Sequence, residues 1–438
     1  MRCFQLSILY NFLRTAFHAC FTSAPTLPMK RILCVFTIAI LTACGATDSS
    51  TTGDSPDATV TPWPTATPSR LDQLYEPLFA LPTPIGRFVP TPTPNAEMLR
   101  LTQYRDLFYA YGIPFPPDLS IPTQRTEFGT QINGCDGPTE SLVRLAKEIG
   151  FKWVKQQVRW GDLTNAAGLT NWECVDRTVD LARQHGLKVM LSVTTAPAHL
   201  RFIPRVTGPP NRLRDWHDFV QALAQRYASR IDAVEIWNEP NLSAEWDEGP
   251  NPRRYGEMLT IAYLAVKRHA PHITVILGGL APLPDSAPPR YISDLEFLDR
   301  LAQDKVGLLG YDCLGTHANG PPDFGYVPDV IRRYRDYYAQ RPDYPRRPLC
   351  LTEFSYSMPI GGQAPPDFGW AIQNNEAEGA ALFRLWLSEI DRSKMVALAF
   401  VFNLGYHDGI TPNSIAALDR PGLSGQILAA IQSYLASR

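Results

Sequence analysis

The alternation of strand-like and helix-like segments after residue 127 constrains the fold more than any other feature of this sequence. Apolar runs of strand length are each followed by a stretch with the periodicity of an amphipathic helix. Strands are expected at 128–133, 151–160, 187–193, 231–237, 273–277, 311–316, 349–353 and 396–402. Helices are expected at 138–149, 172–185, 216–230, 253–269, 292–303, 327–339, 375–391 and 424–436. This pattern predicts a (β/α)8 barrel. An open doubly wound sheet is the alternative, but no glycine-rich dinucleotide turn follows the first strand.

Length and charge exclude several classes of protein. The chain has 438 residues, of which 45% are hydrophobic and 11% aromatic, so it can bury a substantial core. Its 41 basic residues nearly balance its 43 acidic residues, and no basic block is present. We therefore expect no nucleic-acid partner.

The N-terminal part of the sequence carries an export pattern. A positive start at residues 29–31 precedes an apolar run over 32–41, which ends in Leu41-Thr42-Ala43-Cys44-Gly45. The run is too short to span a bilayer and is typical of a signal segment. The small residues before Cys44 resemble a bacterial lipobox, which predicts lipidation of Cys44 and a membrane anchor. The alternative is a plain secretory signal with an incidental cysteine. Residues 1–28 are then expected to be an over-extended gene start.

Residues 45–95 are rich in Ser, Thr and Pro, and such a composition is typical of a disordered tether. The catalytic domain is expected to span residues 96–438. It contains four cysteines, Cys135, Cys174, Cys313 and Cys350, in a setting that permits disulfides. Their pairing stays open at this level, and their spacing does not indicate a metal site.

Two of the expected strands end in a glutamate. The strand over 231–237 runs into Asn238-Glu239-Pro240, and proline at this point ends the ladder. The strand over 349–353 ends in Glu353. In a barrel the carboxyl ends of the strands converge on one pocket. Two carboxyls about 5–5.5 Å apart are what a retaining glycosidase needs. The alternative is a pair of glutamates in surface salt bridges. Glu235, which lies deeper on the same face as Glu239, is expected to belong to the barrel core.

The segments around these glutamates resemble the clan A glycoside hydrolases, near families 5 and 39. The resemblance rests on Ile-Trp-Asn-Glu-Pro-Asn at 236–241 and Thr-Glu-Phe at 352–354, and it extends from about residue 128 to the C-terminus. It implies that Glu239 is the general acid/base and Glu353 the nucleophile. It also implies that Asn238 hydrogen-bonds the sugar 2-hydroxyl. The acid is expected in less polar surroundings, and the nucleophile beside cationic or hydroxyl neighbours.

The second strand departs from the pattern of these relatives. They often carry an arginine near the nucleophile where this chain has Lys155, and Arg159 lies at the strand end. Positions 155, 157 and 159 share one face of the strand, so Arg159 could reach the rim of the pocket. A surface ion pair is the alternative for Arg159.

Further binding residues are expected at three other strand ends. His317 follows the sixth strand, but the tyrosine that relatives place two residues later is absent, which leaves one hydrogen bond to the nucleophile in doubt. In the eighth strand Phe402 stands where relatives place a tryptophan platform, and Asn403 follows it. Tyr356 is a further candidate platform, as are Trp160, Trp246 and Trp370, although such residues more often pack in the core.

Taken together, these patterns predict an exported, lipid-anchored retaining glycoside hydrolase that acts on a β-linked glycan. We expect it to be a monomer that needs neither metal nor organic cofactor. A carbohydrate-binding lipoprotein without turnover is the alternative from another class, and a transglycosylase would use the same pair of glutamates. The sugar, the linkage and the choice between endo and exo action depend on loops that the sequence does not specify.

Overall fold

The computed structural model describes residues 125–204, 207–246, 249–303, 310–342, 346–358, 366–404 and 425–438, together with residues 123 and 344. All of them belong to the unit that runs from Pro68 to Arg438. Cys44, the expected tether and the start of the expected catalytic domain lie outside the described residues.

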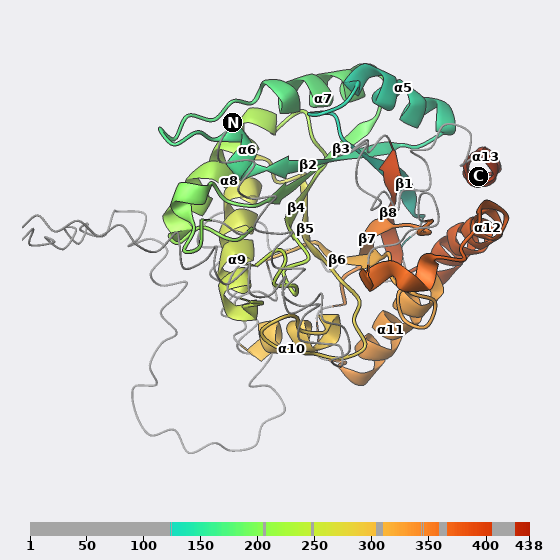
Figure 1. The fold of residues 1–438 in the computed structure, drawn as a ribbon. Helices are drawn as coiled ribbons and strands as arrows, with labels where there is room; N and C mark the ends of the chain where they lie inside the picture. The colour runs from blue at the N-terminus through green and yellow to red at the C-terminus, as the bar shows by residue number, and fades with distance from the viewer. Residues whose placement is uncertain are drawn as a thin grey trace, which may run out of the picture. The chain divides into compact units, whose positions relative to one another are not determined.

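Eight parallel strands form a closed barrel in chain order, because β8 pairs with β1 as well as with β7. Figure 1 looks into this ring of strands. The strands are β1 (Glu127–Ile132), β2 (Trp153–Arg159), β3 (Lys188–Thr194), β4 (Ala233–Asn238), β5 (Thr274–Leu280), β6 (Cys313–Ala318), β7 (Leu349–Phe354) and β8 (Val396–Leu404). The predicted (β/α)8 fold is thereby confirmed.

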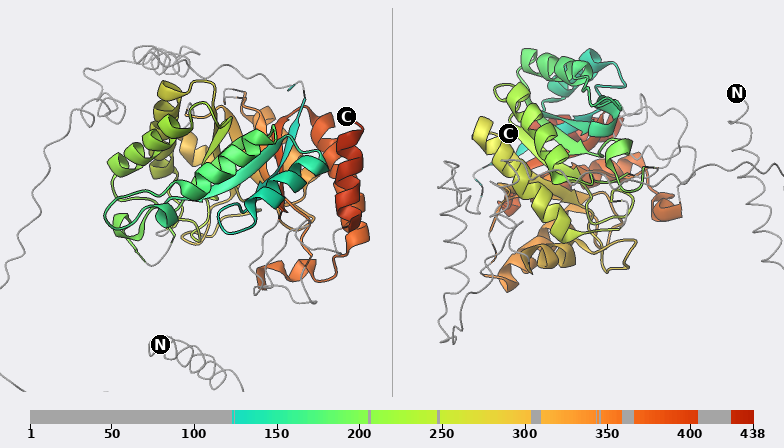
Figure 2. Two further views of the ribbon diagram at one scale, coloured as in Figure 1. Left: turned by 90° about the horizontal axis from the view of Figure 1, so that it is seen from above. Right: turned by 90° about the vertical axis from the view of Figure 1, so that its left-hand side faces the viewer.

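Helices surround the strands, as Figures 1 and 2 show. They are α5 (Thr139–Ile149), α6 (Trp160–Leu163), α7 (Glu173–Gln184), α8 (Leu213–Tyr227), α9 (Pro252–His269), α10 (Asp294–Gln303), α11 (Val327–Gln340), α12 (Glu376–Ser393) and α13 (Gly425–Ala436). The last helix closes the ring, because α13 packs against both α12 and α5. At this end of the chain, the guanidinium of Arg438 donates a hydrogen bond to the carbonyl of Thr126 at 2.8 Å.

Local signals in the sequence set the ends of several helices. Gly150 and Gly186 follow α5 and α7 with φ angles of 103° and 69°, a left-handed conformation that glycine adopts without strain. At the N-termini of α9 and α12, the side chains of Asn251 and Asn375 each accept a hydrogen bond from the backbone N–H three residues later. These asparagine caps satisfy N–H groups that have no partner inside the helix.

The barrel interior changes from apolar to polar toward the carboxyl ends of the strands. Strands β2 to β8 contribute a buried apolar cluster inside the barrel, further from the carboxyl ends of the strands. It consists of Trp153, Met190, Ala233, Ile276, Cys313, Cys350, Leu398 and Phe400. Side chains two positions further along a strand face the same way. On β2 and β4 these positions hold Lys155 and Glu235, both fully buried. Burial of charged groups at this level marks the place where function is expected.

Both cysteine pairs form disulfides. Cys313 and Cys350 join the neighbouring strands β6 and β7, and Cys135 and Cys174 join the loop after β1 to the first turn of α7. Within the described ranges, no helix is both long and apolar enough to cross a membrane.

Candidate active site

Glu239 directly follows β4 in a strained turn. Trp237 and Glu239 have φ angles of 76° and 38°, which cost on the order of 1–3 kcal/mol each for residues other than glycine. Two hydrogen bonds hold this turn. The indole N–H of Trp237 donates to the carbonyl of Glu245 at 3.1 Å, and the N–H of Glu239 donates to the carbonyl of Gly279 at 3.0 Å. The side chain of Glu239 is 25% exposed, so solvent and substrate can reach it.

Glu353 lies near the end of β7 with a cation and an amide against its two oxygens. Nζ of Lys155 is 3.1 Å from Oε1, and Nδ2 of Asn319 donates to Oε2 at 3.2 Å. Ser355 in turn donates to Oδ1 of Asn319 at 2.9 Å, which fixes the amide so that its NH2 group faces the glutamate. Such partners stabilise the ionised form of a carboxyl group.

Lys155 is fully buried between two carboxylates. Nζ lies 3.0 Å from Oε2 of Glu235 and 3.1 Å from Oε1 of Glu353. Burial alone would lower the pKa of Lys155, but Glu235 and Glu353 hold this pKa above its usual value. Burial alone would likewise raise the pKa of Glu235, but Lys155 and His317 hold it below its usual value. Lys155 therefore stays cationic and Glu235 anionic at neutral pH.

His317 touches both candidate catalytic glutamates. Nδ1 lies 2.9 Å from Oε1 of Glu239 and 3.7 Å from Oε2 of Glu353. These two oxygens are therefore at most about 6.6 Å apart, the sum of 2.9 and 3.7 Å. The imidazole is fully buried, which alone would lower its pKa, but the carboxylates of Glu353 and Glu239 raise the pKa of His317 above its usual value. Gly279 packs against Nε2, and a Cβ at this position would collide with the ring.

Glu245 is a third carboxyl group near Glu239. Burial first, and the charge of Glu239 second, raise its pKa to about 7, while Arg159 and a hydrogen bond from Asn238 act in the opposite direction. Asn238 itself is 7% exposed at the end of β4. Glu245 thus titrates in the range where a glycosidase acid/base group works.

Three residues expected to bind substrate are instead completely buried. Lys155, His317 and Tyr356 have no exposed surface. Lys155 and His317 hold the two glutamates in place from below. The hydroxyl of Tyr356 donates to Glu378 at 2.9 Å, and its ring packs near Trp386 on α12. A binding role for these three residues stays a prediction, and their burial was not foreseen, because exposure cannot be inferred from a position near a strand end.

The other expected contact residues are distributed around the rim. Arg159 pairs with Asp162 at 3.1 Å, with side chains that are 44% and 68% exposed, so the surface ion pair considered from the sequence is present. Phe402 is half-buried and shares the inward face of Phe400. Asn403 is buried, and no hydrogen bond within the described residues joins it to either glutamate.

Two of the three tryptophans considered as sugar platforms pack in the protein interior. Trp160 and Trp246 are buried, the first stacked on Phe219 and the second edge-on to Trp237. Trp370 is half-buried in the short 3-10 helix η3 (Pro366–Ala371).

Sequence reasoning missed Asn319 and Glu245. Asn319 lies two residues beyond His317 at the tip of β6, and this spacing could have identified it. Glu245 lies in the loop after β4, where nothing in the local pattern indicates that its side chain turns back toward Glu239. In the part of the chain that the structure describes, no cluster of His, Cys, Asp and Glu could hold a metal ion.

Comparison with known proteins gives partial matches. Residues 117–287 match the model of the cellulase family, glycosyl hydrolase family 5. A beta-xylosidase from Geobacillus stearothermophilus is 23% identical over 261 residues, which are 50% of this chain and 49% of that protein. A glucan 1,3-beta-glucosidase from Blumeria graminis is 41% identical over 86 residues, which are 16% of this chain and 18% of that protein. The chain thus spans half or less of the length of these relatives.

Solved structures share the fold. A family 39 glycoside hydrolase from Bacteroides cellulosilyticus has a TM-score of 0.52 at 19% identity, over 74% of this chain and 66% of that chain. A glucosidase from Croceicoccus marinus has a TM-score of 0.55 at 16% identity, over 72% of this chain and 68% of that chain. The cellulase match and the glycosidase relatives together support a glycoside hydrolase.

Proposed function

We propose that this chain is a retaining glycoside hydrolase that cleaves a β-linked oligo- or polysaccharide, with Glu239 as acid/base and Glu353 as nucleophile. The observation that carries the proposal is the contact of one imidazole nitrogen with both carboxylates, at 2.9 and 3.7 Å. The resulting limit of about 6.6 Å between their oxygens accommodates the separation of about 5–5.5 Å typical of retaining enzymes.

The two glutamates have surroundings that suit different roles. Glu353 contacts Lys155 and Asn319, one at each carboxylate oxygen, so its orientation is fixed as a nucleophile requires. Glu239 is more exposed and has His317 as its hydrogen-bond partner, so it can exchange a proton with the leaving group and then with water.

In the first step Glu239 protonates the glycosidic oxygen while Glu353 attacks the anomeric carbon, which breaks the C–O bond and forms a glycosyl ester. In the second step Glu239 takes a proton from water, whose oxygen displaces Glu353 from the sugar. The anomeric centre is inverted twice and so keeps its configuration. His317 lies within hydrogen-bond distance of Glu239, so it can position this carboxyl for both steps.

The names of the relatives indicate which substrates to try first. The names of the matched proteins point to three classes of glycan: beta-xylosides, beta-1,3-glucans and cellulose-type beta-glucans. The test is a screen of the purified chain on these glycans, with the anomer of the first product followed by proton NMR. We expect β-product first, followed by mutarotation. Initial α-product would contradict the retaining mechanism. Products longer than the starting oligosaccharide would favour transglycosylation.

A glycan-binding protein without turnover is the alternative. It would bind members of the same panel and release no sugar. The ion pair of Lys155 with Glu353 argues against it, because a site that only binds sugar has no need of a buried cation against one carboxylate.

We further propose that the chain is exported and anchored by lipid at Cys44, on the strength of the sequence Leu41-Thr42-Ala43-Cys44. Two disulfides agree with an oxidising compartment. Replacement of Cys44 with alanine should release the protein from membranes or block its processing. Unchanged membrane fractionation of this variant, with no lipid mass on the wild-type protein, would disprove the anchor.

A further inference from the structure

Glu235 carries a buried charge that the proposed mechanism does not use. It lies on β4 before Glu239, and its side chain is fully buried. Burial alone would raise the pKa of Glu235, but Lys155 and His317 hold this pKa below its usual value. Because a buried carboxylate is costly without partners, the contacts of Glu235 indicate what this charge does.

One oxygen of Glu235 is linked to Glu353 through Lys155. Oε2 of Glu235 lies 3.0 Å from Nζ of Lys155, and the same Nζ lies 3.1 Å from Oε1 of Glu353. Nζ also donates to the carbonyl of Thr352 at 3.2 Å. These oxygens match in number the N–H donors of an ammonium group. Glu235 is therefore one of the partners that place the cation against Glu353.

The other oxygen of Glu235 is linked to Glu239 through Gly279 on β5. The N–H of Gly279 donates to Oε1 of Glu235 at 3.0 Å, and the carbonyl of Gly279 accepts from the N–H of Glu239 at 3.0 Å. Gly279 also packs against the ring of His317, and Nδ1 of this ring lies 2.9 Å from Oε1 of Glu239. Gly279 therefore contacts both the backbone of Glu239 and the partner of its side chain.

Side chains replace the regular hydrogen-bond ladder in this part of β5. The N–H of Gly278 donates to the hydroxyl of Tyr255 at 2.6 Å, while the N–H of Gly279 donates to Glu235. In a parallel sheet such N–H groups ordinarily bond to carbonyls of the neighbouring strand. Gly279 is buried, so loss of Glu235 would leave its N–H without this acceptor and away from water. The support that Gly279 gives to Glu239 therefore depends on Glu235.

We propose that Glu235 is a positioning residue that sets the orientation of both catalytic glutamates, Glu353 through Lys155 and Glu239 through Gly279. The inference rests on the proposed function, because it assigns these contacts a part in the same reaction. It gives the two carboxylates a common anchor, so a change at Glu235 alters the chemistry although Glu235 has no exposed surface.

Two substitutions at Glu235 separate the two links. In Glu235→Gln the amide oxygen can still accept from Gly279, but the amide NH2 group faces the ammonium group of Lys155, donor against donor. This variant therefore loses only the link to Glu353. Glu235→Met keeps the length of the side chain and loses both links.

The quantity to measure is kcat/KM on dinitrophenyl and phenyl β-glycosides of the sugar that wild type cleaves. The dinitrophenyl group leaves with little help from an acid, so its kcat/KM reports the attack by Glu353, whereas the phenyl group also needs a proton from Glu239. Glu235→Gln should lower both values by the same factor, about tenfold to a hundredfold, because small displacements of reacting groups cost this much. Glu235→Met should lower the phenyl value more than the dinitrophenyl value. An unchanged ratio of the two values in Glu235→Met would contradict the link to Glu239.

A double-mutant cycle tests the path through Lys155. If Glu235 acts on Glu353 through Lys155, adding Glu235→Gln to Lys155→Met should cause no further loss of kcat/KM on the dinitrophenyl glycoside. Losses that multiply would contradict the inference, because Glu235 would then act on Glu353 by another route.

Asp312 provides a matched control at the amino ends of the strands. It directly precedes β6, is buried, pairs with Nζ of Lys267 at 2.7 Å and accepts from the N–H of Val275 at 2.8 Å. Asp312→Asn thus removes a buried charge with the same kinds of partner as Glu235. It should lower the melting temperature as Glu235→Gln does and leave both kcat/KM values as in wild type. Equal losses of kcat/KM in Asp312→Asn and Glu235→Gln would overturn the inference.

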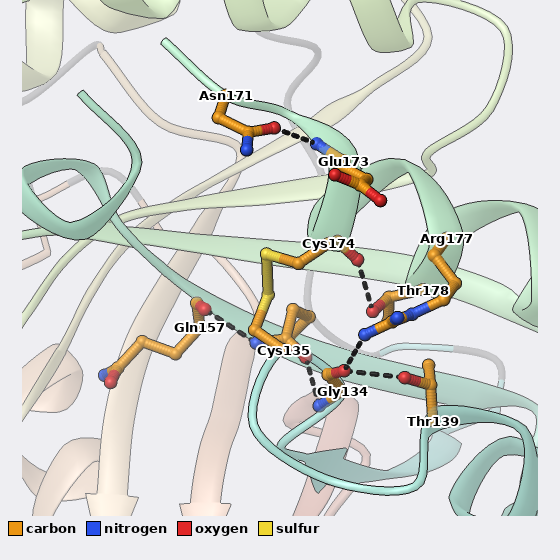
Figure 3. Close-up of a disulfide and its surroundings, with 10 residues drawn as sticks. Gly134, Cys135, Thr139, Gln157, Asn171, Glu173, Cys174, Arg177 and Thr178 are labelled. Atoms are coloured by element: carbon orange, nitrogen blue, oxygen red, sulfur yellow. Dashed lines mark hydrogen bonds between the residues drawn. A yellow bond between two sulfur atoms is a disulfide. The ribbon is translucent and has the colours of Figure 1, made fainter. Parts of the chain in front are cut away.

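A second control lies nearer the carboxyl ends of the strands. The disulfide between Cys135 and Cys174, drawn in Figure 3, joins the loop after β1 to α7. Cys135→Ala/Cys174→Ala should lower the melting temperature and keep the ratio of the dinitrophenyl to the phenyl value. A ratio that rises in this variant as much as in Glu235→Met would contradict a specific role of Glu235.

Glu235→Asp remains a test if the neutral variants do not fold. It keeps the buried charge, but its side chain is one methylene shorter, which loosens the links to Lys155 and Gly279. Its kcat/KM should therefore lie below that of wild type on both glycosides. A wild-type value on both would contradict the inference.

Failure of the proposed function gives a different result. If wild type cleaves none of the aryl glycosides, the hydrolase proposal fails on these substrates, and crystal structures of the variants then test the two links. Glu235→Gln should displace the carboxylate of Glu353 and leave Glu239 in place, whereas Glu235→Met should displace both. Glutamates that keep their positions in both variants would contradict the inference.

Discussion

The ammonium group of Lys155 lies 3.1 Å from a carboxylate oxygen of Glu353, with the lysine fully buried inside the barrel. On its other side Lys155 meets Glu235 at 3.0 Å. One buried cation thus neutralises a structural carboxylate and holds the proposed nucleophile. Stability and catalysis therefore depend on the same side chain.

Lys155→Met should destabilise the protein by about 3–5 kcal/mol, because it leaves two carboxylates buried without their cation. Turnover should fall as well, since Glu353 loses the cation that holds its carboxylate in place. Urea unfolding measures the first effect. The matched control is Lys188→Met, whose pair with Glu127 is exposed and should cost about 1 kcal/mol or less. Similar losses in the two variants would contradict a buried role for Lys155.

The His317 imidazole should make stability depend on pH. Its pKa is raised in the folded protein, so its contribution is fully present below the unfolded value of about 6.5 and is lost as pH rises through the higher folded value. Above about pH 6.5 the free energy of unfolding of wild type should therefore fall more steeply with pH than that of His317→Gln. Urea midpoints from pH 5.5 to 9 measure this difference. If the urea midpoints of wild type and His317→Gln changed with pH in parallel, His317 would not be the source of the pH dependence.

Titration of Glu245 should also lower the stability of the protein as pH rises, but in a lower pH range. A folded pKa of about 7, above the ordinary value of 4.5, means that stability falls as pH rises between these two values. The full shift corresponds to about 3 kcal/mol at most. Glu245→Gln keeps the shape of the side chain and removes the titration, so the variant should become relatively more stable than wild type between pH 5 and 8. Chemical denaturation at several pH values tests this, and an unchanged pH profile in the variant would contradict it.

The two disulfides should contribute nearly equally to stability. They close loops with sequence separations of 39 and 37 residues, so the loss of chain entropy in the unfolded state is almost the same, about 4 kcal/mol for each. The double cysteine-to-alanine variants should show similar drops in melting temperature by calorimetry. A much larger drop for Cys313 and Cys350 would show that packing inside the barrel outweighs the loop effect.

The barrel could be predicted from the sequence because its signals are local. Apolar runs of strand length, Gly186 after a helix and Pro240 after a strand each act on their neighbours, and together they set the order of the elements. The two glutamates could be named as candidates for the same reason, since Glu239 directly follows β4 and Glu353 lies near the end of β7.

The contacts within the site could not be predicted, because they depend on distances between strands. Glu235 was expected to be core, and it is buried, but its pairing with Lys155 requires the tilt and register of the closed barrel. Asn319 donates to Glu353 only because β6 and β7 are adjacent. The burial of Tyr356 follows from the position of α12, which no pattern around residue 356 encodes.

Glu353→Ala and Glu239→Ala should separate the roles of the two glutamates. Without Glu353 neither chemical step can proceed, so turnover should fall by at least about a thousandfold. Without Glu239 an aryl glycoside with a good leaving group still reacts in the first step, and the glycosyl enzyme should accumulate. Circular dichroism of both variants provides the control that the fold is intact.

The most direct measurement is the anomeric configuration, by NMR, of the glycosyl azide that each variant forms from an aryl β-glycoside in the presence of sodium azide. In Glu353→Ala, azide occupies the space of the carboxylate and attacks the anomeric carbon once, so the account predicts the α-azide. In Glu239→Ala, azide attacks the glycosyl enzyme from the opposite face, so the account predicts the β-azide. The same anomer from both variants, or the two anomers exchanged, would contradict the assignment of Glu353 as nucleophile and Glu239 as acid/base.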